Sequence, residues 1–597
     1  MADSPNKNSE GPVRISVFSD GNPLKTSLFG LISLIIYKEV NRIGRATLVF
    51  DSGNMPKGEV SESDDNALAP GKKIRIEAGY GENENPIFEG NVITHRFVIL
   101  EGNESSLQIE CRDYAFPATQ ARKNKIFEKK KDSEAMMEIL GSYSGLNASV
   151  DTTNFKHNEL VQYYCTDWDF ILSRADANGL IVTTEGKNIK VKKPEVNASP
   201  KLKVTYGTDV IEFRGELCVN MQQSGMKAVA WDSSVQKVIS VEGSKPSLNK
   251  QGTDTTDDLS EAAGGEKYIC QTQFCAGEPF LQSWADARLL KTGLSRIQGY
   301  CKFPGNHKAL PGDTIELEGF GKRFNGNAFI GWVEHEIKGG DWVTVVGFGI
   351  SLQNITENTD VMAPSASGLL PGIQGLYVGK VKKLDGDPTG ENKIQVEIPL
   401  VGGTVNAVWA RLGNFWASSS YGAFFIPDIG DEVILGFFNN DPCHAVILGS
   451  LYSSKQKPPY ELTKENDIRS IFTKSKMKLE FNEKDKTITV ETPAKNSIQI
   501  SDKDKSITLK DQNKNKIEMS DSGILIESAK DLTLKAKMNV VIDAGANLDA
   551  KAKGNVSMKG INIEANANAS LTVKGTAKAE ISAAGQTVVK GAMVMIN

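Results

Sequence analysis

The sequence predicts a mainly β protein with a few helices, a five-stranded barrel in its second half and a C-terminal β-rod shared by several chains. Three observations support this fold class. Short alternating strands broken by glycine turns fill most of the first 350 residues. Five strand-like segments then fall within about eighty residues after position 376. The last eighth, from about Ile524, repeats short apolar pairs at a fixed step.

The first region, residues 1–365, is predicted to be a hub of two β-barrels with inserted helices. Strand patterns occur at 46–50, 73–77 and 106–110, and a second β region spans 201–350. Helical patterns occur at 133–141, 167–179 and around 282–294, the first two of which end on glycine. The polar, turn-rich segment 244–265 is predicted to be an exposed loop.

A segment rich in Pro, Gly and Ser at 362–375 predicts a domain boundary, and a small barrel follows at 373–453. Its five strands are predicted at 377–382, 393–398, 408–412, 432–437 and 445–448. The aromatic residues Trp409, Phe415 and Trp416 are expected to pack within this module rather than to stack on a nucleic acid. Residues 454–476 are predicted to form a neck linker, and residues 477–597 a needle.

The needle sequence contains no aromatic residue, proline, cysteine or histidine from Ile524 onward, but its repeat is regular. Residues two apart point to the same side of a strand, and successive pairs are eight residues apart except for one slip of a single residue. Glycine and asparagine lie mostly between the pairs, where tight corners need them. The residues predicted to form the needle core are Leu532, Leu534, Val540, Ile542, Leu548, Val556, Met558, Ile563, Leu571, Val573, Ile581 and Val589.

Energetics favours sharing this repeat among chains. Each unit buries two modest side chains, worth at most about 2 kcal/mol apiece. Ordering its eight residues costs on the order of 8–16 kcal/mol of backbone entropy. Three chains wound into one triangular prism, a triple-stranded β-helix, would give each strand partners and a common core. A one-chain solenoid and a disordered tract are the alternatives.

Composition excludes several functional classes. The formal net charge of −5 and the pI near 5.8 argue against nucleic acid as a partner. The polar N-terminal segment lacks the apolar core of a signal peptide, so assembly in the cytoplasm is expected. No histidine pair has zinc-site spacing, and neither a phosphate loop nor a nucleophile elbow is present. We therefore expect no catalytic residue, no metal and no cofactor.

Two motifs in separate regions make the sequence similar to a known family. The hub motif consists of Gln162, Trp168, Phe170, Arg174 and Gly179. The barrel motif consists of Gly422, Pro427, Gly430, Val433, Asp441, Pro442 and Gly449. With the order of hub, small barrel and rod, they resemble VgrG, the spike protein family of type VI secretion systems, which is itself similar to the hub and needle of contractile phage tails. The resemblance implies phage-tail-hub-like barrels and an oligonucleotide/oligosaccharide-binding (OB) type barrel.

The resemblance also implies a function and partners. It implies a non-enzymatic homotrimer that caps an Hcp-like tube, meets baseplate components, carries effector proteins and touches the target membrane transiently. Export would proceed by type VI secretion without a signal peptide. A conical PAAR-repeat tip protein would bind the apolar chain end, Met593, Val594, Met595, Ile596 and Asn597. The alternatives are the spike of a phage tail or an extracellular contractile injection system, and a trimeric adhesin-like or enzyme-bearing spike.

Overall fold

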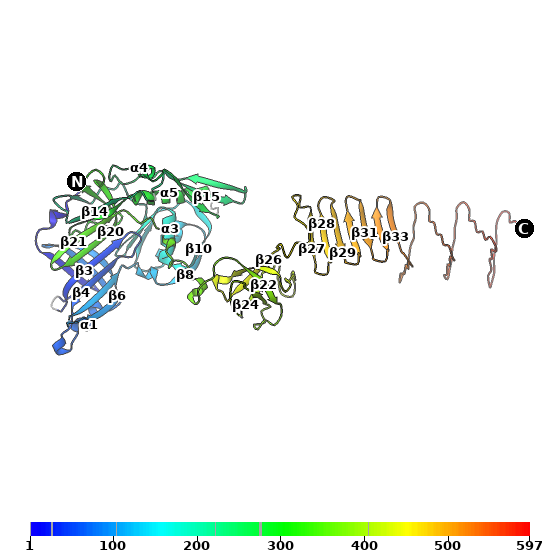
Figure 1. Cartoon of the computed structure of the whole chain (residues 1–597), viewed down its shortest axis with the longest axis horizontal. Helices are drawn as coiled ribbons and strands as arrows, with labels where there is room; N and C mark the ends of the chain where they lie inside the picture. The colour runs from blue at the N-terminus through cyan, green and yellow to red at the C-terminus, as the bar shows by residue number, and fades with distance from the viewer. Residues whose placement is uncertain are drawn as a thin grey trace. The chain divides into compact units, whose positions relative to one another are not determined.

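The computed structural model describes residues 2–25, 28–102, 104–220, 222–273, 277–403 and 405–596. Figure 1 shows a chain dominated by strands, with short helices confined to its first part. The chain divides into two compact units, Met1–Leu451 and Tyr452–Asn597. The finer domain boundaries expected from the sequence, at 365, 373, 453 and 477, stay predictions.

One large sheet dominates the first unit. It has 13 strands, in the order β14-β18-β21-β20-β3-β4-β7-β6-β5-β1-β2, with β13 and β19 attached beside β20. Its N-terminal strands are β1 (Val13–Ser19), β2 (Asn22–Pro23), β3 (Gly30–Glu39), β4 (Arg45–Asp51), β5 (Lys73–Tyr80), β6 (Asn83–Ile99) and β7 (Ser105–Arg112). Its later strands are β13 (Leu202–Thr205), β14 (Glu212–Leu217), β18 (Ile297–Pro304), β19 (Thr314–Glu318), β20 (Gly326–Lys338) and β21 (Asp341–Phe348). Antiparallel pairing of β20 with β3 joins the two halves of the hub.

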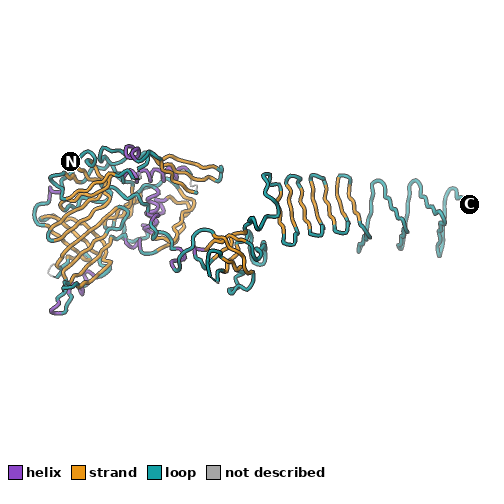
Figure 2. The backbone as a smooth tube through the Cα atoms, in the orientation of Figure 1, coloured by secondary structure: helices purple, strands orange, loops and turns teal. Residues whose placement is uncertain are grey.

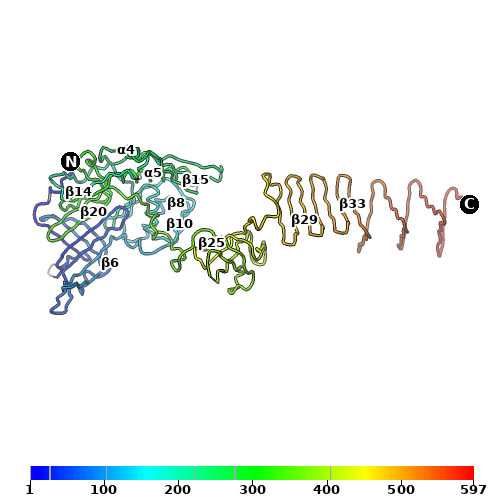
Figure 3. Tube along the Cα trace, viewed as in Figure 1, coloured from blue at the N-terminus to red at the C-terminus, as the bar shows by residue number. Residues whose placement is uncertain are grey.

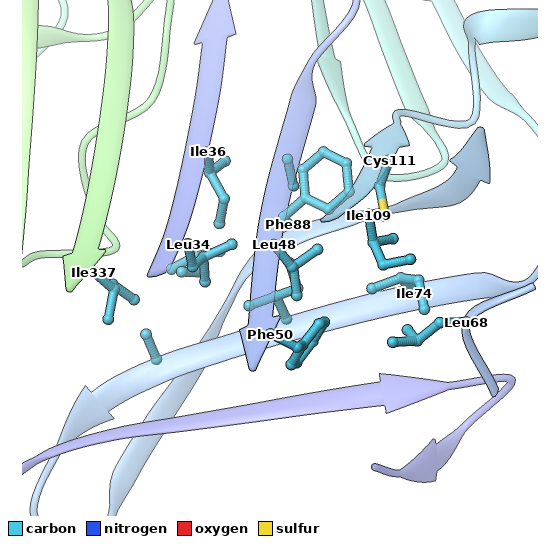
Figure 4. Packing of buried hydrophobic residues seen from close by; sticks show 14 of the residues in the cluster. Leu34, Ile36, Leu48, Phe50, Leu68, Ile74, Phe88, Ile109, Cys111 and Ile337 are labelled. Atoms are coloured by element: carbon cyan, nitrogen blue, oxygen red, sulfur yellow. The ribbon is translucent and has the colours of Figure 1, made fainter. Parts of the chain in front are cut away.

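Each half of this sheet has its own hydrophobic core. Alternate residues of β3, β4, β5 and β7 point inward in the first half, where Leu34, Leu48, Ile74 and Ile109 are fully buried (Figure 4). The second core is formed by β13 and β18–β21, with Phe303 at its centre. The expectation of two barrel-like halves therefore corresponds to two cores under a single continuous sheet.

A small α/β layer is inserted between the two halves. Its helices are α2 (Asp132–Gly141) and α3 (Asp167–Ala177), at the positions the sequence predicts. Its strands are β8 (Arg122–Lys131), β9 (Asn147–Val150), β10 (Lys156–Thr166), β11 (Ile181–Glu185) and β12 (Asn188–Lys192). The apolar faces of both helices share one core with these strands.

A second insertion holds a three-stranded sheet against a helix. The strands β15 (Gly225–Asp232), β16 (Lys237–Glu242) and β17 (Lys267–Thr272) pack on α5 (Glu278–Leu294). The prediction that 244–265 is an exposed loop is wrong in part, because α4 (Thr256–Ala262) forms within it. Asn249 and Gln251 are also buried there, because the Arg296 guanidinium donates hydrogen bonds to their backbone carbonyls.

The remaining helices of the described chain are short. They are α1 (Ser61–Asp64) and the 3-10 turns η1 (Pro5–Asn8), η2 (Met55–Lys57), η3 (Asn66–Leu68), η4 (Phe116–Thr119), η5 (Ile355–Glu357), η6 (Ser365–Gly368) and η7 (Phe438–Asn440). No helix in the described ranges is long and apolar enough to span a bilayer.

The small barrel is closed, with strand order β22-β23-β24-β26-β25. Its strands are β22 (Tyr377–Lys383), β23 (Ile394–Glu397), β24 (Ala407–Leu412), β25 (Glu432–Phe437) and β26 (Ala445–Ser450). These bounds confirm the five predicted strands to within two residues. Val396, Val433, Leu435 and Ile447 are fully buried at its centre.

The second unit begins with an antiparallel meander, residues 468–527, in which the chain runs back and forth through seven strands (Figure 3). The strands are β27 (Ile468–Phe472), β28 (Lys478–Asn482), β29 (Thr487–Glu491), β30 (Ser497–Ser501), β31 (Ser506–Lys510), β32 (Lys516–Ser520) and β33 (Gly523–Glu527). Beyond Glu527 the described residues form neither helix nor strand (Figure 2). We refer to residues 529–596 as the tail.

Candidate functional site

The meander presents two columns of apolar side chains on one face. In β28 to β33 the second and fourth residues are apolar, and the register sets them directly opposite their equivalents on the next strand. In β27 only the fourth of these two positions, Ile471, is apolar, because Arg469 occupies the second. The columns are Phe481, Ile488, Ile500, Ile507, Met519 and Ile524, and Ile471, Leu479, Val490, Ile498, Leu509, Ile517 and Ile526. Except for half-buried Leu479, all of these side chains are exposed. The face includes a shallow concavity of about 620 Å³ lined by Val490, Ile498, Leu509 and Leu532.

The opposite face of the meander is polar. Thr489 and Thr508 are buried there, and ion pairs form between Lys478 and Glu480 and between Lys516 and Glu518. The Tyr460 hydroxyl donates a hydrogen bond to the Glu480 carboxylate. Partial burial and this anionic partner raise the pKa of Tyr460 to about 12. The asymmetry identifies the apolar face as the side that lacks a partner.

Asparagine side chains connect successive turns along one edge of the meander. The Asn496 Oδ1 atom accepts the Gln512 backbone N–H at 3.0 Å. One hairpin later, the Asn515 Oδ1 atom accepts the Ala529 backbone N–H at 2.9 Å and the Ser528 hydroxyl at 3.2 Å. Asn515 therefore holds the chain at the point where the meander ends and the tail begins.

The tail is neither buried nor paired as strands within its own chain. All of its residues are exposed, and its described residues make no backbone-to-backbone hydrogen bond. The twelve predicted needle-core residues all lie here, with exposed fractions from 58% at Leu532 to 81% at Ile581. Their assignment to a shared core stays a prediction, as does their register.

The predicted tip residues end this tail. Met593, Val594, Met595 and Ile596 are exposed, and Asn597 lies outside the described residues. Their role in binding a tip protein stays a prediction.

The hub motif is brought together around the start of α3. Trp168 and Phe170 are buried in the core of the α/β layer. The Gln162 amide donates a hydrogen bond of 2.8 Å to the Asp167 carboxylate, which also accepts from Lys123 and Tyr143 at 2.6 Å. Burial alone would raise the pKa of Asp167, but these three donors hold it below its usual range.

Gly179 lies just beyond α3 and permits close packing. Its φ of +66° is left-handed, and an added Cβ would lie 3.2 Å from the Ala287 Cα atom of α5. This glycine therefore lets the end of α3 approach α5.

Arg174, the last member of the hub motif, belongs to a buried network that the sequence reasoning missed. Its guanidinium contacts the fully buried Asp132 carboxylate at 2.6 and 3.2 Å, and the Asn178 amide and the His157 Nε2 atom lie within 3.1 Å of it. Burial works to raise the pKa of Asp132, but the hydrogen bond with His157 and the charge of Arg174 hold it well below its usual range. The one signal in the sequence was the position of Asp132 at the start of α2, ahead of the helix α3 that carries Arg174.

The barrel motif mixes core and turn residues. Val433 is fully buried, Gly449 pairs with Ile434, and Pro427 and Gly430 lie in the loop before β25. Asp441 caps the turn through Pro442 by accepting the Cys443 N–H at 2.8 Å. An added Cβ at Gly422 would meet the Trp416 carbonyl oxygen at 2.8 Å, so this position requires glycine.

The expectation that the barrel aromatics pack inside the module is wrong for two of three residues. Trp409 is half-buried on β24, but Phe415 is 83% exposed and Trp416 is 56% exposed. The physical reason is that β24 ends at Leu412, so both rings lie on a loop outside the closed barrel.

The described residues contain no group of three or more His, Cys, Asp or Glu side chains arranged to hold a metal ion. The described residues of the second unit offer exposed apolar surface and unpaired backbone, features that favour association with other polypeptides.

Comparison with protein families gives two matches. The model of the Alg8 N-terminal domain matches residues 9–339, more than half of the chain. The model of the type VI secretion system/phage-baseplate injector OB domain matches residues 377–452, the closed barrel described above.

Curated proteins give shorter matches. The chain is 41% identical over 64 residues to the type VI secretion system spike protein VgrG5 of Pseudomonas aeruginosa, covering 11% of this chain and 8% of VgrG5. It is 37% identical over 82 residues to the actin cross-linking toxin VgrG1 of Vibrio cholerae, covering 14% of this chain and 8% of that protein. The chain thus matches less than a tenth of the length of either relative.

Among solved structures, a 43 kDa prophage MuSo2 tail protein from Shewanella oneidensis is 11% identical, with a TM-score of 0.42. The alignment covers 57% of this chain and 98% of that one. The sequence matches relate the chain to VgrG spike proteins, and by the match over residues 9–339 the chain belongs to the Alg8 N-terminal domain family.

Proposed function

We propose that this protein is the structural spike of a type VI secretion system, a homotrimer that caps a secreted tube and punctures the envelope of a target cell. The observation that carries the proposal is the second unit, where an exposed apolar sheet face is followed by an exposed tail whose described residues form no strand. The OB-domain match over residues 377–452 and the VgrG relatives supply the biological setting.

Three copies satisfy the physical requirements of this unit. Three meanders would face their apolar columns inward as a triangular prism, removing about 25 cal/mol of unfavourable hydration per Å² of apolar surface buried. The tail would pair its backbone with the other two copies, so that few strand edges remain exposed. A needle built in this way spreads its stability over many repeats, which suits a part that is driven through a membrane.

Its partners follow from this role. The hub would meet an Hcp-like tube protein and baseplate components, and the chain end would carry a PAAR-repeat tip protein and effectors. Contact with the target membrane would be transient, and nucleic acid is not a partner. The spike would assemble in the cytoplasm and leave the cell by type VI secretion without a signal peptide.

The role we propose is structural and not enzymatic, without a cofactor. One relative is named a toxin, but the match covers 8% of that protein. The spike of a phage tail or of an extracellular contractile injection system is the second candidate. The family description of the barrel, which names both type VI secretion and phage baseplates, favours keeping it.

Secretion tests this function directly. Removing residues 528–597 should abolish secretion of the tube protein, while the shortened chain still accumulates. Normal tube secretion by the shortened chain would contradict the proposal. A sheath, a tube protein and a conical tip protein encoded beside this chain would identify a contractile system.

The tip can be tested separately. Deleting Met593–Asn597 should leave the oligomer intact, abolish binding of the tip protein and lower tube secretion. A deletion variant that still retains its tip protein and secretes normally would show that these residues are only a chain end.

A further inference from the structure

An aromatic loop projects from the closed barrel. It comprises residues 413–427, between the end of β24 and the start of β25, and contains no charged residue. Five of its rings are exposed: Phe415, Trp416, Tyr421, Phe424 and Phe425. Phe424 is the most exposed, at 88%.

The loop is ordered although its rings are exposed. An isolated bridge joins Ala417 to Gly422, and the Ala423 N–H donates to the Trp416 carbonyl at 2.9 Å. The Asn414 amide donates to the Ala423 carbonyl, which closes the base of the loop. Phe415 stacks on Phe425 with ring centroids 6.3 Å apart. A loop held in this way loses little conformational entropy when it binds.

The same barrel carries a second apolar surface on its outer wall, where Leu376, Val378 and Leu448 are exposed and Ile434 and Val446 are half-buried. Leu376, Val378, Ile434, Val446 and Leu448 project there from neighbouring positions around β22, β25 and β26. Leu376, Val446 and Leu448 close over Gly436, where an added Cβ would lie 3.3–3.8 Å from their side chains. We call these five residues the apolar wall. The wall ends at the paired charged residues Lys380 and Glu432, which give it a polar rim.

We propose that the aromatic loop of one copy packs on the apolar wall of the next copy, so that the three barrels form a closed ring. This inference rests on the proposed trimer. In a ring of three, each copy meets its two neighbours through two different surfaces, and this barrel offers two such surfaces of different shape. Rigid aromatic side chains on one and aliphatic side chains on the other match the core of a stable interface.

Tethering makes such a contact favourable even if it is weak alone. The barrel ends at Ser450 and the meander begins at Ile468, so only residues 451–467 separate each barrel from the meander along the chain. Chains joined through one needle therefore hold their barrels at an effective concentration of order millimolar. An uncharged aromatic loop also suits the surface of a bilayer, but that role would leave the apolar wall without a partner.

Cross-linking between copies tests the contact. Two full-length chains that both carry Cys443→Ser are co-expressed. One chain also carries Phe424→Cys, the other carries Leu448→Cys, and one of the two has a larger tag so that they can be told apart. A short bismaleimide should give a product that contains both tags. The pair Phe424→Cys and Leu400→Cys is the control, because Leu400 is 84% exposed, more than Leu448 at 53%, but lies outside the apolar wall. This pair should give no product. Adding Val378→Glu to the productive pair should remove the product, and adding Leu400→Glu should not.

Light scattering on the same samples separates the possible failures. A trimer without the two-tag product would overturn the barrel contact and leave the proposed function standing. A monomer would contradict the proposed function itself, and this contact with it. Binding to phosphatidylcholine and phosphatidylglycerol vesicles that Phe424→Ser abolishes, without any cross-link, would assign the loop to a membrane and overturn the contact.

Discussion

The meander and the tail, the two halves of the second unit, differ in how their backbone and side chains find partners. In the meander, every strand is paired with its neighbours within one chain, and only one face of side chains lacks a partner. In the tail, the described residues make no backbone-to-backbone hydrogen bond, and every side chain is exposed. The meander therefore keeps its strands in a single chain, whereas we expect the tail to form strands only with other copies.

This difference indicates which part of the second unit depends most on the proposed trimer. An unpaired, extended backbone costs about 1–2 kcal/mol per residue to order, and small side chains at eight-residue intervals do not repay it within one chain. Part of the backbone entropy lost on ordering the meander is already lost within the single chain, before the chains associate. We therefore expect the meander to dock first and the tail to pair afterwards.

The largest effect should come from a charge in the predicted axis of the tail. Val556→Asp would place three carboxylates at one level of a dry core, at a cost of several kcal/mol per trimer. Ser557→Asp, one residue away and facing outward, should be nearly silent. Thermal unfolding and trimer yield measure both. Equal losses for the two variants would mean that the predicted register is shifted by one residue.

The next largest effect should be confined to the first unit and leave the second unit unchanged. Asp132→Asn leaves half-buried Arg174 without its fully buried anionic partner, which should destabilise the first unit by about 3–5 kcal/mol. Chemical denaturation monitored by the buried Trp168 measures this, and Asp151→Asn is the surface control. The meander and tail should be unaffected. A matching loss of needle stability would show that the two units do not unfold separately.

The same network predicts the acid response of the hub. Because the folded-state pKa of Asp132 lies below its unfolded value of about 3.9, the stabilisation is present above that value. It should disappear as the pH falls through the folded-state pKa. A pH titration of hub unfolding should therefore show an acid loss that Asp132→Asn removes. An unchanged acid profile in the variant would contradict this assignment.

A smaller effect is expected on the meander face. Ile500→Ala removes apolar surface that the trimer should bury, at a cost of about 1–2 kcal/mol per chain. Strand content in the separated chain should not change, because Ile500 is exposed there. Gln499→Ala, on the opposite face, is the control. If concentration-dependent dissociation is the same for both variants, the apolar columns do not form the interface.

The smallest effect concerns the junction between the halves. Asn515→Ala removes the hydrogen bonds to Ala529 and Ser528, worth about 1 kcal/mol together in net stability. Exchange of the Ala529 amide should accelerate. Asn513→Ala, whose side chain bonds only within its own turn, should leave that amide unchanged. If Ala529 amide exchange accelerates equally in both variants, Asn515 does not hold the junction between meander and tail.

Local patterns predicted the parts of the fold that depend on neighbouring residues. The five barrel strands and helices α2 and α3 were found because alternation, helical spacing and glycine ends are local signals. The pairing of β20 with β3 joins residues nearly 300 positions apart, and no local pattern carries that information. For the same reason, the single continuous sheet was not expected.

The candidate site was predicted less completely. The needle was predicted as one region, 477–597, and its sequence did not indicate that residues 468–527 pair as strands within one chain. The exposure of Phe415 and Trp416 was missed because aromatic composition does not reveal whether a ring precedes or follows the end of a strand. The Asp132 network was missed because its members come from α2, β10 and α3, which meet only in the fold.

Hydrogen–deuterium exchange on the full chain tests the central claim most directly, with light scattering on the same sample. The account predicts slow exchange of tail amides in a species near three times 64.8 kDa. On dissociation, the tail should lose its protection while the meander retains much of its own. Tail amides that exchange at the unpaired rate in a trimer, or that are protected in a monomer, would contradict it.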